Sequence, residues 1–291
     1  MKICKHFHYA TSIEDALEAM RLSAGNVSVL AGGTDLLLDL QQGRHAPVDT
    51  LVDITNINEM KALELQPEGI FIGGAVPHRT ITTSPMICEH APALAEASGL
   101  IGGPQVRNVA TLGGNVAHAL PAADGTLALM ALDARVEIAS PDGRRLAPLV
   151  SLFKGPGENT LHPTGELLVG FHLPIRQAGE GSAFHRVMRP QGVAIAILNC
   201  AVWLRRSENK ITDIRVSVGP SGPTPRRLTT VEEALKGHTP TPEVLQQAFQ
   251  LLLSEAHFRT SRHRATQDYR VHMAGVLLTD SVTLAWERAA S

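Results

Sequence analysis

The chain has 291 residues, of which 44% are hydrophobic and 19% charged, with a formal net charge of −2 at pH 7. This length favours two or three subdomains over one small core. The balanced charge excludes the broad basic surface of a nucleic-acid-binding protein. The N-terminus lacks the apolar core of a signal peptide, and no apolar run is long enough to span a bilayer. We therefore expect a cytoplasmic protein that neither binds nucleic acid nor inserts into a membrane.

The cysteines and histidines show no metal-binding pattern. Cys4, Cys88 and Cys200 lie far apart, and no pair has the C-x-x-C spacing of a zinc site or an iron–sulfur cluster. The thirteen histidines include no paired motif such as H-E-x-x-H. We predict no metal site on this chain.

The first sixty residues or so predict a small α/β unit. Thr11 and Glu14 have the spacing of a capping box, and apolar residues recur at helical intervals over 13–20. Apolar strands are expected at 27–30 and 50–54, separated by a glycine turn and a helical segment. This order fits a crossover connection.

The turn after the first of these strands contains Gly32 and Gly33, followed by Thr34 and Asp35. Glycine takes a positive φ without penalty and has no Cβ to obstruct a ligand. Successive N–H groups that point into one hollow form an anion-binding nest, especially where a helix follows. The turn therefore predicts a phosphate-binding loop, for which an ordinary strand-to-helix turn is the alternative.

The rest of the chain predicts two more regions and, taken together, an α+β fold. The middle region shows a helix at 90–97 and strand patterns at 63–65, 70–72, 134–139, 145–150 and 166–173. A polar, glycine-bearing segment at 176–181 predicts a linker. Beyond it, strands are expected at 183–188, 193–204 and 211–218, and the pattern is helical from 226 to the end.

A second turn with paired glycines follows Thr111 and ends in Asn115. Two such nests on separate subdomains suit an extended diphosphate held between them. Both named residues can add side-chain hydrogen bonds. Neither glycine pair matches G-x-G-x-x-G or G-x-x-x-x-G-K-[ST], so a Rossmann or Walker-type site has no support.

Two charged residues near this turn need partners. Asp124 lies in an otherwise apolar run, where a carboxylate requires a group such as a ribose hydroxyl or a backbone N–H. Arg107 has the geometry to bind a phosphate bidentately, and pairing within the protein is an equally good interpretation.

The stretches 31–37, 104–115 and 121–124 resemble the FAD-binding medium subunit of molybdenum hydroxylases, the xanthine dehydrogenase and carbon monoxide dehydrogenase family. The resemblance continues through 165–168, 223–227 and 269–270 and covers nearly the whole chain. It implies a two-subdomain FAD-binding fold of the vanillyl-alcohol-oxidase type, with an N-terminal α/β subdomain at 1–60 and a second, α+β subdomain at 61–175. A C-terminal α+β domain at 182–288 would contain a three-stranded antiparallel sheet with helices.

The resemblance also implies where FAD lies, between the first two subdomains with its diphosphate on the two glycine turns. His185 stands where the family often has lysine, and an imidazole is shorter and only partly charged near neutral pH; Arg186 is an alternative contact. The positions that the resemblance assigns to FAD are Val29, Leu30, Ala31, Gly32, Gly33, Thr34, Asp35, Leu36, Ile101, Thr111, Leu112, Gly113, Gly114, Asn115, Asp124, Leu168 and His185.

The implied function is electron transfer within a heterotrimer. In such complexes a large molybdopterin subunit hydroxylates the substrate, and two [2Fe–2S] clusters on a small subunit pass electrons to FAD and then to NAD or another acceptor. No residue of this chain is assigned as a catalytic acid or base. The lack of clustered cysteines argues against the benzoyl-CoA-reductase branch, whose flavin subunit carries a four-cysteine cluster. A stand-alone flavin-dependent oxidoreductase and a non-catalytic scaffold subunit remain alternatives.

Overall fold

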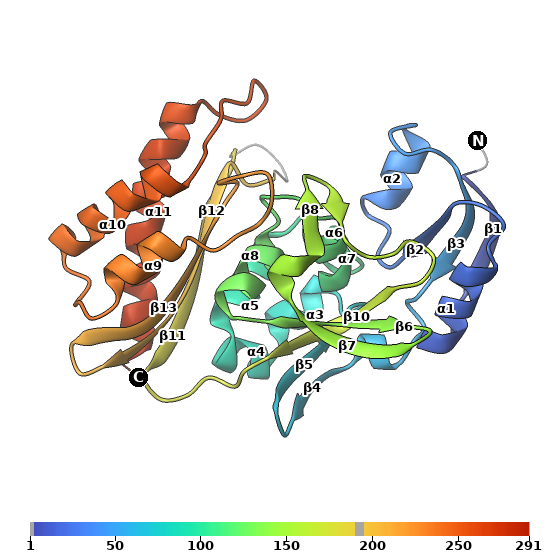
Figure 1. The fold of residues 1–291 in the computed structure, drawn as a ribbon, viewed down its shortest axis with the longest axis horizontal. Coiled ribbons are helices and arrows are strands. Elements are labelled where there is room, and N and C mark those ends of the chain that lie inside the picture. The colour runs from blue at the N-terminus through green and yellow to red at the C-terminus, as the bar shows by residue number, and fades with distance from the viewer. Residues whose placement is uncertain (1–2, 190–194, 291) are drawn as a thin grey trace.

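The computed structural model describes residues 3–189 and 195–290, and three main β-sheets follow one another along these ranges (Figure 1). The first sheet is parallel, with the strand order β1–β3–β2. Its strands and the helices that connect them are β1 (Cys4–Tyr9), α1 (Ile13–Leu22), β2 (Val27–Leu30), α2 (Leu36–Gln41) and β3 (Val48–Asp53). The expected crossover connections are present, and β1 is a strand that the sequence pattern did not predict.

The start of α1 differs by one residue from the predicted capping box. The N–H of Asp15 donates to Ser12 Oγ at 3.1 Å, and the N–H of Thr11 donates to Asp15 Oδ2 at 2.8 Å. Ser12 and Asp15 therefore cap the helix in place of Thr11 and Glu14. The predicted apolar face is buried: Ile13, Ala16, Leu17 and Met20.

The second sheet is antiparallel, with the strand order β4–β5–β10–β6–β7. Both predicted hairpins are confirmed, and the strand expected at 166–173 lies between them and joins them into one sheet. The strands are β4 (Leu63–Gln66), β5 (Gly69–Gly73), β6 (Arg135–Ser140), β7 (Gly143–Pro148) and β10 (Leu167–Leu173), with a small pair, β8 (Phe153–Gly155) and β9 (Glu158–Asn159). The helices are α3 (His78–Thr83), α4 (Pro85–His90), α5 (Pro92–Leu100), α6 (Pro104–Arg107), α7 (Leu112–Ala117) and α8 (Asp124–Ala131), with 3₁₀ turns at Glu59–Lys61 and Leu149–Leu152.

The third sheet is antiparallel with the order β11–β12–β13, and helices follow it to the end, as predicted. Its elements are β11 (Glu180–Val187), β12 (Leu198–Ser207), β13 (Lys210–Gly219), α9 (Thr229–Leu235), α10 (Pro242–Glu255) and α11 (Gln267–Arg288). The predicted linker ends early because Glu180 is buried and paired with Arg205, so β11 begins there. The strand expected at 193–204 begins at Leu198, and positions 193 and 194 lie outside the described residues.

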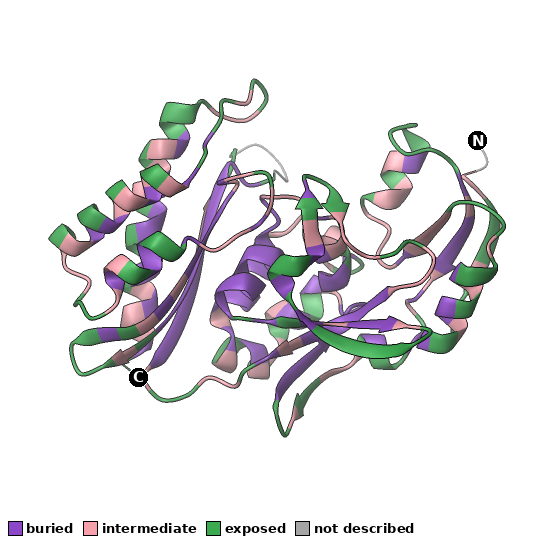
Figure 2. Ribbon diagram, viewed as in Figure 1, coloured by how far each residue is buried: buried purple, intermediate pink, exposed green. Residues whose placement is uncertain are grey.

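The third sheet lies between two layers of helices, with α5 and α8 on one face and α11 on the other (Figure 2). Successive side chains of a strand point to opposite faces. Phe184 and Trp203 accordingly join the core of the middle region, whereas Ala183 and Val202 pack with the C-terminal helices. The two regions therefore share a continuous apolar interior.

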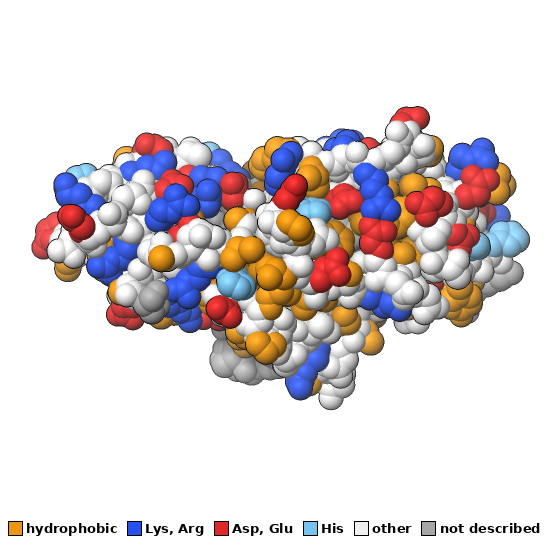
Figure 3. All heavy atoms as spheres, turned by 90° about the horizontal axis from the view of Figure 1, so that it is seen from below, with side chains coloured by type: hydrophobic (Ala, Val, Ile, Leu, Met, Phe, Trp, Pro, Cys, Tyr) orange, Lys and Arg blue, Asp and Glu red, His pale blue; other side chains and the backbone are white. Residues whose placement is uncertain are grey.

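The surface mixes both signs of charge. Seen from below, acidic and basic side chains are interspersed over the end that carries the C-terminal helices, and apolar side chains gather near the middle (Figure 3). Among the described residues, no helix has both the length and the hydropathy needed to cross a bilayer.

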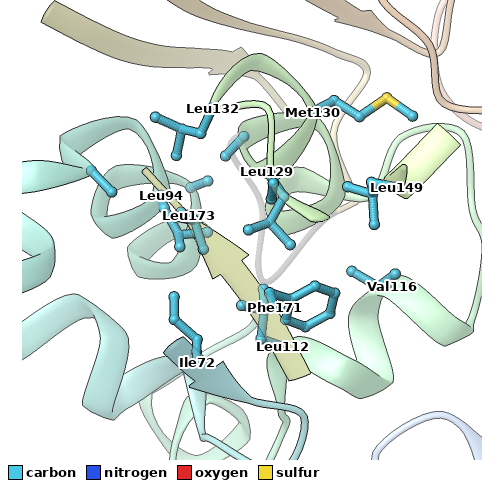
Figure 4. Close-up of a cluster of buried hydrophobic side chains, with 14 of the residues drawn as sticks. Ile72, Leu94, Leu112, Val116, Leu129, Met130, Leu132, Leu149, Phe171 and Leu173 are labelled. Carbon is cyan, nitrogen blue, oxygen red and sulfur yellow. The ribbon is translucent and has the colours of Figure 1, made fainter. Parts of the chain in front are cut away.

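The core of the middle region includes a side chain from the second glycine turn. Leu112, which opens α7, is fully buried in this core, as are Phe171 of β10 and Leu129 of α8 (Figure 4). Burying a leucine side chain contributes about 1.5–3 kcal/mol. This packing anchors the turn to the sheet beneath it.

Candidate functional site

The first glycine turn presents a run of unused backbone donors. It lies between β2 and α2, and Gly33 has φ +69°, a conformation that glycine adopts without strain. The five successive N–H groups of residues 32–36 have no acceptor within the described parts of the chain. These donors match the predicted anion-binding nest.

The second turn differs from the expectation of a second empty nest. The four N–H groups of residues 112–115 all have acceptors in the chain: Val76 O at 3.1 Å, Gly74 O at 3.0 Å, Thr111 Oγ1 at 3.1 Å and Thr111 O at 3.0 Å. The hydroxyl of Thr111 is thus the N-cap of α7. Of the predicted donors in this turn, the N–H of Thr111 has no acceptor within the described ranges.

The two turns lie directly against each other. A Cβ at Gly32 would overlap the carbonyl oxygen of Val109 and crowd Ala110, the residue before the second turn. Gly114 is exposed, and the single neighbour of its Cβ position is Thr111 Oγ1 at 3.2 Å. The turns therefore meet through their backbones, with an open position at Gly114.

Arg107 closes the loop before the second turn. Its Nη1 donates to the carbonyl oxygens of Ile101 at 3.1 Å and Gly102 at 2.6 Å. Gly102 has φ +54°, which allows the chain to fold back on itself there. The internal pairing of Arg107 is the interpretation that the structure supports.

A segment that the sequence analysis did not single out supports the second turn. Gly74 and Val76 supply acceptors to the turn, and the N–H of His78 donates to Ala110 O at 3.0 Å. A Cβ at Gly113 would overlap the backbone of Gly74. Gly73–Gly74 is one of four adjacent glycine pairs in the sequence, and this pair was the available signal for the segment.

Asp124 is buried at the N-terminus of α8, where it is 5% exposed, and its partners come from the third sheet. Its Oδ2 accepts a hydrogen bond from Arg186 Nη1, and its Oδ1 accepts one from Asn199 Nδ2 at 2.5 Å. Burial raises the pKa of the Asp124 carboxyl, and the charge of Arg186 opposes that shift. The expected ribose hydroxyl or backbone N–H is thus replaced by a guanidinium and an amide.

His185 and Arg186 point to opposite sides of β11. The Nδ1 of His185 lies 3.1 Å from Ser281 Oγ of α11, whereas Arg186 faces α8 through Asp124. The side chain of Arg186 is 5% exposed, so it is committed to the buried ion pair. Arg186 is therefore not free to serve as the alternative flavin contact, and the contact expected of His185 stays a prediction.

The other predicted positions form the apolar and polar surroundings of the turns. Leu30 and Leu168 are buried core residues, and Val29 and Leu36 pack at the edge of cores. Asn115 Oδ1 accepts a hydrogen bond from the N–H of Thr126 at 3.2 Å, which joins α7 to α8.

These residues fit the diphosphate of FAD. A diphosphate needs several donors and a close approach to the backbone, which the run at 32–36 and the open position at Gly114 provide. A Cβ at Gly114 would extend into that opening.

Comparison with known proteins shows the family to which the chain belongs. Residues 2–176 match the FAD binding domain in molybdopterin dehydrogenase, and residues 182–285 match the CO dehydrogenase flavoprotein C-terminal domain. The chain is 32% identical over 275 residues to the xanthine dehydrogenase FAD-binding subunit of Escherichia coli O157:H7, covering 92% of this chain and 91% of that one. It is 31% identical over 278 residues to the nicotine 6-hydroxylase medium subunit of Paenarthrobacter nicotinovorans, covering 95% of each chain.

A solved structure shows the same fold. It is the carbon monoxide dehydrogenase of Hydrogenophaga pseudoflava that lacks the Mo-pyranopterin moiety of its molybdenum cofactor. One of its chains aligns with a TM-score of 0.91 at 29% identity, covering 97% of each chain.

Lowering the pH is expected to destabilise the support beneath the second turn. His78 is 1% exposed; burial, and to a smaller extent the charge of Arg107, lowers its pKa from 6.5 to about 4. Below pH 6.5 the unfolded chain binds a proton at His78, whereas the folded chain does not. The free energy of unfolding therefore keeps its full value above that pH and falls by up to about 3 kcal/mol toward pH 4. Urea unfolding at neutral and mildly acidic pH should show this loss, and His78→Leu should reduce it.

The exposed His45 provides the control for this experiment. His45→Gln should leave the pH dependence unchanged. An identical acid loss in the wild type and in His78→Leu would contradict the assignment.

Removing one partner of the buried ion pair is expected to cost more than removing both. Asp124→Leu leaves Arg186 charged and buried without a carboxylate, a loss of about 3–5 kcal/mol in unfolding free energy. Asp124→Leu combined with Arg186→Met removes the uncompensated charge and should recover a large part of that loss. Denaturant unfolding of Asp124→Leu, of Arg186→Met and of the double variant measures the difference. A loss in the double variant equal to the sum of the losses in the two single variants would refute the coupling.

Proposed function

Because the chain belongs to the family of FAD-binding subunits of molybdenum hydroxylases, which includes those of xanthine and carbon monoxide dehydrogenases, we propose that it transfers electrons within a xanthine-dehydrogenase-type complex. It would receive them from [2Fe–2S] clusters on a small subunit and pass them to NAD or another acceptor. A large molybdopterin subunit would carry out the hydroxylation. The observation that carries this proposal is the run of five free N–H groups packed against a second glycine turn.

The proposed role of the first turn is to bind the diphosphate. The N–H groups of residues 32–36 would donate to its oxygens, and Thr34 adds a hydroxyl in the same run. The second turn would contribute the N–H of Thr111 and the open backbone at Gly114. Since the two turns touch at Gly32, the chain would hold the diphosphate where its first two sheets meet.

FAD, when bound, supplies a group that accepts single electrons and delivers a hydride. This chain's residues hold and shield that group. Leu168, which lies in the core below Gly74, contributes to an apolar wall, and Ile101 is fixed by the Arg107 bridge to its carbonyl. Asp124 would act indirectly, because both its oxygens already fix α8 to the third sheet.

The similarity to these relatives supports the proposal that the chain works in a molybdenum hydroxylase complex more strongly than it supports any one substrate. The identities to the xanthine dehydrogenase subunit and to the nicotine 6-hydroxylase subunit are nearly equal, 32% and 31%. The substrate therefore depends on the molybdopterin subunit with which the chain assembles. A stand-alone flavin oxidoreductase and a scaffold are the alternatives that the next two experiments test.

Gly114→Val is expected to reduce bound FAD strongly without unfolding the protein. The new side chain would extend into the opening beside Thr111, where the diphosphate approaches the backbone. Flavin absorbance per protein after purification, and after incubation with FAD, measures the effect.

Gly275→Val in α11 is the matched control, since this is a helical glycine whose Cβ would lie 3.2 Å from its nearest neighbour, the Phe249 ring. This variant should keep its flavin. Undiminished FAD in Gly114→Val would show that the second turn is misplaced in the proposal, and a wild-type chain that never binds FAD would favour the scaffold.

The assembly is tested on native material. The chain should copurify with two subunits, one containing iron–sulfur clusters and one containing molybdenum, and reduced FAD should be reoxidised by the physiological acceptor. Full activity of the isolated chain with its own substrate would favour the stand-alone enzyme.

A further inference from the structure

The loop between α10 and α11 concentrates positive charge. Residues 256–266 include Arg259, Arg262 and Arg264, with no aspartate or glutamate among them. The loop rises at the upper end of the C-terminal helices (Figure 1). Across the described parts of the chain, none of these three side chains forms a hydrogen bond or an ion pair.

The acidic residues that flank the loop do not neutralise it. Glu255, at the end of α10, accepts a hydrogen bond through Oε2 from the N–H of Thr230 at 3.1 Å. Asp268, in the first turn of α11, is exposed and forms no ion pair with any described residue.

A fourth arginine, Arg270, lies buried in the first turn of α11, directly after the loop. Arg270 is 2% exposed, and its Nη1 donates to Ile197 O at 2.5 Å. Its Nε is buried without a partner, and no described carboxylate pairs with the guanidinium. A buried cation without a counter-charge is costly, and it is usually paired.

The charges of this group act on one another. Burial lowers the pKa of Arg270, and the charges of Arg264 and Arg259 lower it further. The N-terminus of the 22-residue helix α11 adds the positive end of its dipole at the same place.

The loop is held in shape by its own hydrogen bonds. The N–H of Ser261 donates to Ala265 O at 2.9 Å, and the N–H of Arg264 donates to Ser261 O at 3.1 Å. The N–H of Gln267 donates to Thr260 Oγ1 at 3.0 Å, which ties the loop to the start of α11. The arginines are therefore mounted on an ordered loop.

We propose that Arg259, Arg264 and Arg270 form a second anion site, which binds the phosphate group of a phosphorylated ligand. A phosphate carries up to two negative charges and several acceptor oxygens, and it can satisfy more than one guanidinium at a time. Arg270 supplies a buried guanidinium whose Nε has no partner among the described residues, and Arg259 and Arg264 supply two more from the loop that precedes it. The site goes beyond the proposed electron transfer and does not depend on it.

The test uses the full chain loaded with FAD, so that the glycine turns are already filled. Calorimetric titration at low ionic strength with inorganic phosphate, ADP and NAD⁺ should reveal saturable binding of at least one probe. Equal affinity for phosphate and ADP would mean that the phosphate alone is recognised. Tighter binding of ADP or NAD⁺ would mean that the rest of the nucleotide contributes.

Charge-reversal variants distinguish binding at the proposed site from binding elsewhere on the chain. Arg264→Glu should weaken binding by at least about tenfold, because it replaces an attraction by a repulsion. Arg79→Glu is the control: Arg79 is exposed on α3 and has no ion pair among the described residues, so its reversal should leave binding unchanged.

Arg270 is not substituted in this test, because Arg270→Gln at a buried position risks misfolding. Arg259→Gln and Arg264→Gln leave the buried residue in place and should each weaken binding, with FAD content as the check on folding. The site is refuted if no probe binds saturably, or if Arg264→Glu binds as well as the wild type does.

Discussion

The site depends on how the chain satisfies its backbone N–H groups. A buried N–H without an acceptor is costly, so a folded chain normally pairs nearly all of them. The second glycine turn obeys this rule, because Gly74, Val76 and Thr111 accept its N–H groups. With the N–H groups of residues 112–115 paired and Leu112 in the core, the backbone of this turn is held in place. Gly32 packs against the backbone just before this turn, which places the free donors of the first turn beside it.

The C-terminal region is part of the same construction. Phe184 and Trp203 complete the core of the middle region, and Asp124 fixes α8 to the third sheet through Arg186 and Asn199. Removing the third sheet would therefore expose apolar side chains and deprive the Asp124 carboxylate of both its partners. The sheet stabilises the surroundings of the glycine turns even though none of its own residues lies in them.

Local patterns predicted the local structure well. The strand at 27–30, both hairpins of the second sheet and the helix opened by Pro92 follow from residue spacing and turn chemistry. Strand β1 was missed because it has no continuous apolar face: Lys5 and His6 precede Phe7, and His8 separates Phe7 from Tyr9. The partners of Asp124 could not be predicted, since Arg186 and Asn199 lie 62 and 75 residues away in the chain.

The sequence alone does not determine which arginines have partners inside the protein. Arg107 and Arg186 both lie near the predicted site, and each has a partner inside the protein, two carbonyls for the first and a carboxylate for the second. Arg264 has no such partner among the described residues, although nothing in its sequence neighbourhood distinguishes it from an ordinary surface arginine. The net charge does not distinguish paired from unpaired arginines. A formal net charge of −2 excludes a basic protein, but it is compatible with a local cluster of guanidinium groups near one buried cation. An anion site therefore depends on which positive charges the fold leaves without partners. The total number of charges in the sequence does not show where these unpaired charges lie.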